Sequence, residues 1–503
     1  MKKSISISNL RKQWFLFAVI SIILLATVLR FANYSERFGL AYDQAHDALI
    51  AHYAVTSYQL PLLGPFSSAG PFQTGGEWYW LIMSGTVLAP QFLLSPWIFI
   101  TSLSVLFVYL MILVGKEIAG KQFAILAGFL AAVSPGQINQ STNLTNQSPQ
   151  SLFAVLAIWF ALLFLHQYKL RYAFLLGLTI GIASSIHLSG VALGSLAVGL
   201  LCIFLFVEKK IPYRAALLVI LGVVLPWIPV LLVDLQHHFF NFGNMIQYYL
   251  HDQHNISLDV LGRRWLTYLG VFWPTEWAFI IGGFPWVGYL IGVSFLSFIF
   301  LRKFVKKEIV ILLISLAIMI GLLRYTHTPI FTSYLVFTHP FVLLITAWII
   351  FMLWRKQVFV GAAFFALLVA SSLWQDYQII STAQNQTAHT VEKQIQALEA
   401  RYPNKKFAVY TYQGKWNDKN YSLALFLVKR GLLDDNGIKV STVIATQVPE
   451  LKKYVFFGPE GDFQLVAVPK LSAKEFEQKQ WKQISDKQIY KETEEWFYHK
   501  DQP

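Results

Sequence analysis

Cysteine is nearly absent from this sequence: Cys202 is the single one in 503 residues. One thiol forms no disulfide within the chain and builds no cysteine cluster for a metal ion. Charged residues are scarce as well, at 13% of the chain, roughly half the usual share in a soluble domain. These shortages exclude a small disulfide-rich scaffold, a disordered chain and an ordinary cytosolic enzyme.

Apolar and aromatic side chains are abundant instead. Hydrophobic residues make up 55% of the chain and aromatic residues 16%. The net charge of +13 would suit a nucleic-acid partner, but 22 of the 40 basic residues lie within residues 1–384, in short loops between apolar runs. Membrane proteins distribute basic residues in this way. We therefore predict a polytopic α-helical membrane protein that contacts membrane lipid and no nucleic acid.

Many apolar runs approach the length of about 20 residues that a helix needs to cross a bilayer. We predict eleven transmembrane helices, at residues 13–33, 94–115, 120–134, 149–166, 172–188, 190–207, 213–233, 278–301, 309–324, 333–354 and 357–374.

The basic residues orient these spans. With the N-terminus in the cytoplasm, the cytoplasmic side carries 17 of the 22 basic residues of this region, and nine of its twelve acids fall outside. This asymmetry follows the positive-inside rule. Residues 1–29 have a long apolar stretch without a cleavage site of small residues, which favours an uncleaved signal anchor. We expect a multi-pass protein of the cytoplasmic (inner) membrane.

Three predicted outer segments are too long to be turns: residues 34–93, 234–277 and 375–503. The last is expected to be an extracytoplasmic soluble α/β domain, following a transmembrane domain of residues 1–374. Its lack of cysteine favours a bacterial source. Its predicted strands are 407–412, 440–445, 454–457 and 463–468, and its predicted helices are 422–431 and 472–481.

The first outer segment carries a pair of carboxylates. Asp43 and Asp47 are four residues apart, so they share one side of a predicted interfacial helix over about residues 43–58, with His46 beside them. A carboxylate held there can act as a general base on an acceptor hydroxyl. The alternative is a solvated helix start, where an aspartate stabilises the helix dipole. The spacing leaves both interpretations open.

An aromatic run follows in the same segment. Glu77, Trp78 and Tyr79 come directly after Gly75-Gly76. These side chains are candidates for binding substrate. An aromatic belt at the membrane surface explains the rings equally well.

The pattern Tyr42-Asp43-Gln44-x-x-Asp47-Ala-x-x-Ala, after an apolar first helix, resembles the GT-C superfamily. Its members are multispanning glycosyltransferases that use polyprenyl-phosphate-linked sugars. The bacterial protein O-mannosyltransferases and lipid A aminoarabinose transferases are the most similar in pattern. They carry an Asp-Glu pair here. Asp43 matches the Asp and Gln44 departs from the Glu, so we expect Asp47 to take the place of that second acid. The resemblance covers residues 10–375.

The resemblance implies a reaction. A sugar would move from a polyprenyl-phosphate donor to the hydroxyl of a protein, lipid or glycan acceptor, at the outer face of the membrane. Asp43 would be the base and Asp47 would support it, in one inverting displacement. The phosphate leaves as a stable anion, so the step needs no general acid. A membrane transporter or lipid flippase is the alternative, and a non-catalytic envelope scaffold is a second one.

A lipid phosphate needs cations, and few lie on the predicted outer side. Arg324, Arg263 and Arg264 are the candidates, because a guanidinium binds phosphate through two parallel hydrogen bonds. The alternative for each is an anchor at the membrane surface.

Histidines and one tyrosine complete the expected site. His187, His327 and Tyr334 are candidates for contacting substrate, although His187 also suits helix packing. The sequence points to no particular cofactor. A divalent metal remains an alternative because one outer segment holds several potential ligands: His237, His238, His251, Asp252 and His254.

Overall fold

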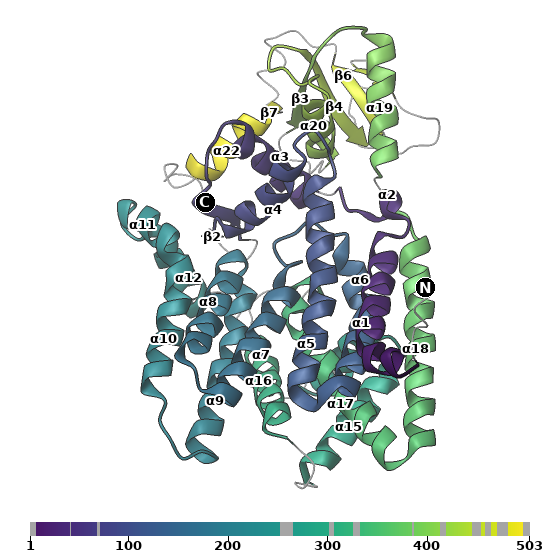
Figure 1. Ribbon diagram of the computed structural model, residues 1–503. Helices are drawn as coiled ribbons and strands as arrows, with labels where there is room; N and C mark the ends of the chain where they lie inside the picture. Colours follow the sequence, from purple (N-terminus) through teal and green to yellow (C-terminus); the bar gives the residue numbers. More distant parts are fainter. Residues whose placement is uncertain are drawn as a thin grey trace, which may run out of the picture.

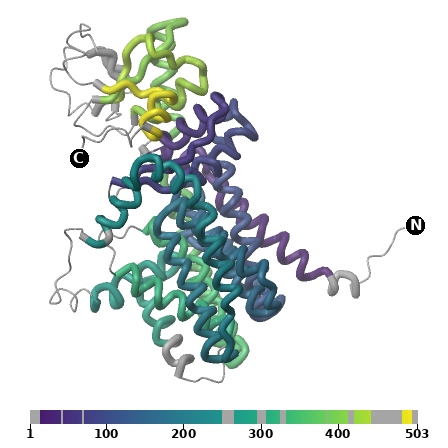
Figure 2. Tube along the Cα trace, turned by 90° about the vertical axis from the view of Figure 1, so that its left-hand side faces the viewer, coloured from purple at the N-terminus to yellow at the C-terminus, as the bar shows by residue number. Residues whose placement is uncertain are grey.

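The computed structural model describes residues 7–40, 42–67, 71–251, 265–300, 306–324, 332–384, 387–412, 419–444, 454–457, 464–469 and 481–495. A long bundle of apolar helices carries an α/β domain at one end, and the two short helices α3 and α4 lie between them (Figures 1 and 2).

The bundle contains most of the helices. They are α1 (Ile7–Phe31), α5 (Ser95–Ala132), α6 (Pro135–Ser141), α7 (Gln150–Gln167), α8 (Leu170–Ile186), η1 (Leu188–Leu193), α9 (Gly194–Phe206), α10 (Tyr213–Val224), η2 (Leu225–Trp227), α11 (Ile228–Gln236), α12 (Phe240–His251), η3 (Tyr268–Phe272), α14 (Trp273–Ile281), α15 (Pro285–Phe300), α16 (Lys307–Leu323), η5 (Thr332–Thr338), α17 (His339–Lys356) and α18 (Val358–Ser381).

Seven segments of the described residues are long and apolar enough to cross a membrane, by length and composition, or up to eight if one bent pair counts as a span. The chain is therefore a multi-pass membrane protein, while the predicted number of eleven is not confirmed. One of the seven, α5, holds two predicted spans. Its backbone leaves the helical conformation at Ala119 and Gly120. A Cβ on Gly115 would lie 2.9 Å from the Cα of Ala124, and one on Gly128 would lie 2.2 Å from Ile112. The two halves of α5 therefore pack antiparallel, as the predicted spans 94–115 and 120–134 require.

The prediction of one straight span at residues 278–301 is wrong, because the chain bends within it. The helical segment Trp265–Ile281 and the following Pro285–Val293 are bent by 102°. Gly282 and Gly283 make the bend, with φ of 79° and 121°, values that side chains with a Cβ rarely adopt. A Cβ on Gly282 would also lie 2.5 Å from the Cα of Ser372 in α18. This close approach and the following proline fix the bend.

The first outer segment is ordered by short elements. It contains α2 (Tyr34–Arg37), α3 (Tyr42–Thr56), the antiparallel strands β1 (Leu63–Phe66) and β2 (Gln73–Gly75), and α4 (Glu77–Leu88). The helix expected over about 43–58 is α3.

The C-terminal domain is a five-stranded mixed sheet with helices. Its strand order is β5-β6-β4-β3-β7, with β3 and β4 parallel and the other pairs antiparallel. The elements are α19 (Ala388–Arg401), β3 (Phe407–Tyr412), α20 (Lys419–Lys429), β4 (Ile438–Ile444), β5 (Tyr454–Phe457), β6 (Gln464–Pro469), β7 (Trp481–Ile484) and α22 (Asp486–Glu495). All four predicted strands and the helix predicted at 422–431 are present. The helix predicted at 472–481 lies outside the described residues, except for Trp481, which begins β7. The helix α18 continues to Ser381, past the expected domain boundary at 374.

This domain packs directly on α3. Ser422 of α20 donates a 2.6 Å hydrogen bond to the carbonyl of Leu40. The rings of Tyr53 and Tyr490 lie 5.1 Å apart. Side chains of α3, α4, α20 and α22 share one hydrophobic cluster. The helix α3, which carries Asp43 and Asp47, is thus packed between the bundle and the C-terminal domain.

Candidate active site

Asp47 of α3 is hydrogen-bonded to the first residues of α4. Its carboxylate is buried, with 4% of the residue exposed. Oδ2 accepts a 2.6 Å hydrogen bond from Nε1 of Trp78, and Oδ1 accepts one of 3.5 Å from the hydroxyl of Tyr79. The Nδ1 atom of His46 lies 3.0 Å from Oδ1. His46 lies beside Asp47 as expected, and the contacts of Trp78 and Tyr79 with the same carboxylate fix the start of α4 on α3.

Asp43 occupies a different environment. It lies in the first turn of α3 and is exposed. Residues four apart on a helix share a side, so Asp43 lies one turn before Asp47. Next to it, Gln44 donates a 2.6 Å hydrogen bond to the side-chain oxygen of Asn143. Asp43 is thus an accessible carboxylate on a helix whose first turn is held in place.

Glu77 links this region to the end of α8. It is 8% exposed, and Ser185 donates a 2.6 Å hydrogen bond to its Oε2. A Cβ on Gly75 would lie 1.9 Å from Oγ of Ser185, so only glycine fits there. Burial raises the pKa of the Glu77 carboxyl above its ordinary value of 4.5. Glu77 is a buried acid whose ionised form is costly.

The raised pKa of Glu77 makes a prediction about stability against pH. The folded state binds the proton of the Glu77 carboxyl more tightly than the unfolded chain does. The contribution of Glu77 to folding stability is therefore fully present below pH 4.5 and is lost as pH rises through the folded-state pKa. Glu77→Gln removes this dependence. We expect the variant to gain thermal stability relative to the wild type as pH rises above 4.5. Thermal unfolding midpoints in detergent across the pH series measure the difference. A difference that stays constant with pH would contradict the burial argument.

The indole of Trp78 offers a second prediction. Trp78→Phe leaves a buried oxygen of Asp47 without its closest donor, so we expect a loss of about 1–3 kcal/mol in stability. The matched control is Trp80→Phe, because Trp80 donates a hydrogen bond of the same length, 2.6 Å, to a neutral acceptor, the carbonyl of Pro61. Thermal or denaturant unfolding compares the two variants. Equal losses would show that the charge of Asp47 does not matter to this contact.

The structure brings together His187 and Tyr334, two of the candidates for contacting substrate. Their rings lie 5.2 Å apart, and His187 Nδ1 is 2.7 Å from the hydroxyl of Ser189. The adjacent carbonyl of Ile186 accepts hydrogen bonds from Thr74 of β2 and Asn146. His187 and Tyr334 therefore lie at the same end of the bundle as Glu77.

Arg324 has the features of an anion-binding group. It caps the end of α16, is 6% exposed, and has its guanidinium over the rings of Trp265 and Tyr268, with centroids 5.4 and 6.0 Å away. Within the described part of the chain, its Nε and Nη2 have no hydrogen-bond partner. A buried charge without a partner is costly, and an anion bound at these N–H groups would offset that cost. The helix η1, which His187 caps, contacts both α16 and η5.

Two other buried arginines differ from Arg324. Arg30 donates to the carbonyls of Ala131 and Ala132, and Arg37 donates to the carbonyl of Ile138 and to three carbonyls near the end of α1. Backbone carbonyls accept hydrogen bonds from both guanidinium groups, and Arg30 Nε donates to the hydroxyl of Ser104. They hold the end of α1 against α5 and α6.

Some expected site residues lie outside the described residues: Arg263, Arg264 and His327, together with Asp252 and His254 of the alternative metal site. Among the described residues, no group of three or more His, Cys, Asp or Glu side chains is arranged to hold a metal ion. His237 Nδ1 lies 2.7 Å from the carbonyl of Val233 in its own helix.

Sequence reasoning did not identify Ser185 as a site residue. It lies in an apolar span, where one hydroxyl gives no signal of its own. Only the folded contact with Glu77 reveals it.

Comparisons with known proteins agree with this architecture. Residues 78–229 match the family described as dolichyl-phosphate-mannose-protein mannosyltransferase. The structure of ArnT from Cupriavidus metallidurans bound to undecaprenyl phosphate is similar with a TM-score of 0.62 at 12% identity, over 92% of this chain and 99% of that one. The Archaeoglobus fulgidus oligosaccharyltransferase is similar with a TM-score of 0.55 at 13% identity, over 83% of this chain. This chain spans 64% of the length of that enzyme. A comparison with curated proteins gives no match.

The structural comparisons show the fold of the chain. The chain is a membrane protein with the fold of the GT-C glycosyltransferases, the class of enzymes that use lipid-linked sugars. The fold that the resemblance in the sequence implies is confirmed.

Proposed function

We propose that this chain transfers a sugar from a polyprenyl-phosphate donor to an acceptor hydroxyl, with Asp43 as the general base. The observation that carries the proposal is the accessible carboxylate of Asp43 on α3, one turn before the anchored Asp47. Preorganised groups of this kind favour catalysis because they need little rearrangement during the reaction. The similar ArnT structure is bound to undecaprenyl phosphate, which supports a donor of that class.

The reaction is a single displacement. Asp43 accepts the proton of the acceptor hydroxyl while the hydroxyl oxygen attacks the anomeric carbon. The bond between that carbon and the phosphate oxygen breaks, and polyprenyl phosphate leaves as an anion. The new bond forms on the opposite face, so the configuration inverts. Asp47 does not take the proton in this scheme, because its oxygens already accept hydrogen bonds; it positions α3.

Arg324 binds the donor phosphate. Its Nε and Nη2, which have no partner among the residues that the structure describes, present two donors to a phosphate beside the rings of Trp265 and Tyr268. Arg263 and Arg264 precede Trp265 in the sequence and remain candidates for the same role. His187, His327 and Tyr334 are the proposed contacts with sugar or acceptor. Trp78 and Tyr79, which are 0% exposed and donate to Asp47, and Glu77, which accepts from Ser185, hold the surrounding structure in place instead.

The proposed location is the outer face of a bacterial cytoplasmic membrane. The N-terminus is placed in the cytoplasm and the C-terminal domain outside. The basic turns support this orientation: Lys209, Lys210 and Arg214 lie around the start of α10, at the end of the bundle away from the C-terminal domain (Figure 1).

A transfer assay tests the proposed function. The purified full chain in lipid nanodiscs is given a sugar-labelled polyprenyl monophosphate and short-chain alcohols, lipids or peptides as acceptors. We expect the label to leave the lipid, and NMR of the product to show the inverted anomeric configuration. Empty nanodiscs are the control. A retained configuration would contradict the single displacement. Movement of intact donor across vesicle membranes without bond cleavage would favour the flippase alternative.

A further inference from the structure

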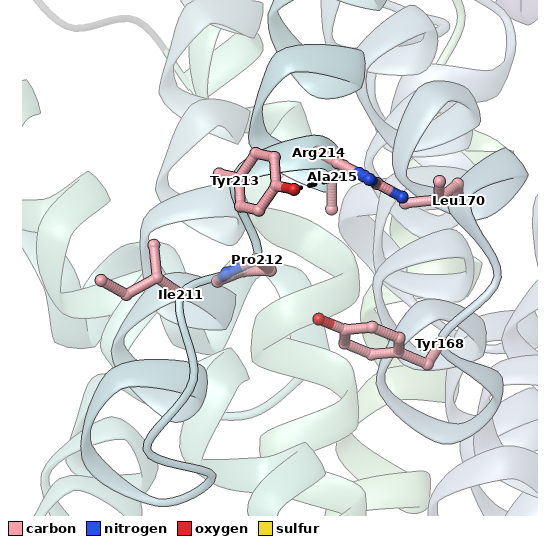
Figure 3. Close-up of a pocket in the computed structure, with 7 residues that line it drawn as sticks. All are labelled: Tyr168, Leu170, Ile211, Pro212, Tyr213, Arg214 and Ala215. Atoms are coloured by element: carbon pink, nitrogen blue, oxygen red, sulfur yellow. Dashed lines mark hydrogen bonds between the residues drawn. The ribbon is translucent and has the colours of Figure 1, made fainter.

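A pocket of about 300 Å³ opens at the end of the bundle opposite the C-terminal domain. The turn between α7 and α8 supplies Tyr168 and Leu170, and the start of α10 supplies residues 211–215 (Figure 3). Pro212 and Ala215 are buried and form the inner wall, while Ile211 and Tyr213 are exposed. The pocket is therefore remote from the α3–α4 region, and nothing in the proposed transfer reaction uses it.

Polar groups converge on this pocket. Figure 3 shows the hydroxyls of Tyr168 and Tyr213 and the guanidinium of Arg214 around the same space. Arg214 Nε donates a 3.2 Å hydrogen bond to the Tyr213 hydroxyl. No carboxylate pairs with Arg214 in the part of the chain that the structure describes, so its terminal N–H groups remain available to an anion.

The surroundings are basic. The two turns that form the pocket, residues 166–172 and 208–214, contain five lysines and arginines and a single acid, Glu208. Glu208 is already paired with Lys307 of α16. The N-terminal ends of both α8 and α10 lie here, and a helix N-terminus adds partial positive charge. The local potential therefore favours an anion.

The rim of the pocket is apolar. Ile211 is 73% exposed and Phe206, at the end of α9, is 78% exposed. Exposed apolar side chains beside a cationic pocket suit a ligand with a charged head and hydrocarbon chains better than a free inorganic ion. Basic pockets between transmembrane helices are known sites for acidic lipid headgroups.

We propose that this pocket binds the phosphate headgroup of an anionic phospholipid from the leaflet opposite the C-terminal domain. Arg214 and the Tyr168 hydroxyl contact the phosphate, and the acyl chains run along the exposed apolar side chains of the rim. A bound headgroup joins the start of α8 to the start of α10 and stabilises the folded bundle by mass action.

Native mass spectrometry of the full chain tests this site. Phosphatidylglycerol or phosphatidylcholine is added to the protein in detergent, and the lipid that stays bound after the detergent is removed is measured. We expect retained phosphatidylglycerol, with an affinity lowered about fivefold by Arg214→Gln, the factor expected for one basic side chain near an acidic headgroup. Leu170→Trp fills the pocket without removing charge and should lower retention as well. The matched control is Arg355→Gln, because Arg355 is exposed and lies over an aromatic ring, that of Phe351, as Arg214 lies over Tyr213.

Three outcomes would overturn the proposal. Equal retention of phosphatidylcholine would show that the headgroup charge is not recognised. Unchanged retention in both Arg214→Gln and Leu170→Trp would place the lipid elsewhere. Complete competition by inorganic phosphate would assign the pocket to a free phosphate rather than to a lipid. Thermal unfolding midpoints of the variants establish that they are folded.

Discussion

Asp43→Asn is expected to reduce glycosyl transfer by about 100- to 10,000-fold, the range for loss of a general base. The asparagine side chain has nearly the same shape and cannot accept the proton of the acceptor. Because Asp43 is exposed, its replacement should change stability by only about 0.5 kcal/mol. The measurement is kcat with a polyprenyl monophosphate sugar at saturating concentration, alongside a thermal unfolding midpoint.

The control for this substitution is Glu36→Gln, which removes an acid of the same outer segment from α2. We expect it to keep nearly full activity. Full activity of Asp43→Asn at normal stability would exclude Asp43 as the base. A loss of the same size in Glu36→Gln would indicate a general effect of negative charge on this surface.

Arg324→Met is expected to weaken donor use by about 10- to 100-fold, the cost of losing charge-assisted hydrogen bonds to a phosphate. Its effect on stability should have the opposite sign. The substitution replaces a buried cation whose Nε and Nη2 lack partners within the described residues, so the unliganded protein should keep or raise its unfolding midpoint. The donor dependence of transfer and the unfolding midpoint without donor measure the two effects.

Arg37→Met is the matched control for Arg324→Met. Arg37 is also buried, at 2% exposure, but its guanidinium donates to four backbone carbonyls. We expect its replacement to destabilise the protein clearly, because those carbonyls lose their donor. If Arg324→Met instead destabilised the protein as strongly and left the donor dependence unchanged, Arg324 would be a structural residue.

Local sequence patterns predicted much of the fold because their causes are local. The apolar runs reveal most of the bundle, and the break between residues 115 and 120 coincides with the non-helical backbone of Ala119 and Gly120. Short apolar runs predicted the strands of the C-terminal sheet. Their order could not be predicted, because β3 pairs with both β4 and the distant β7.

The bend at Gly282 shows why hydropathy alone fails. Residues 278–301 are apolar throughout, so a hydropathy pattern predicts one straight helix. The glycine pair and Pro285 break it, and the contact of Gly282 with Ser372 in α18 makes the break necessary. Helix geometry in this region is decided by a neighbour distant in sequence.

The sequence identified several residues of the candidate site, but it did not show which of them are buried and structural and which are accessible. Spacing places Asp43 and Asp47 on one side of α3, and it does not reveal which of them is buried. Burial follows from α4, whose Trp78 reaches the carboxylate of Asp47. The same limit applies to Arg324, because its sequence neighbours do not reveal that its guanidinium packs over two aromatic rings.

The central claim is that Asp43 acts on the reacting hydroxyl and not on the binding of the donor. The most direct measurement is a single-turnover transfer rate for wild type and Asp43→Asn, with the bound polyprenyl-phosphate sugar quantified in the same samples. We predict equal donor occupancy and a transfer rate that is lost only in the variant. Equal transfer rates at equal occupancy would contradict the claim, and so would a loss of transfer that is explained entirely by loss of bound donor.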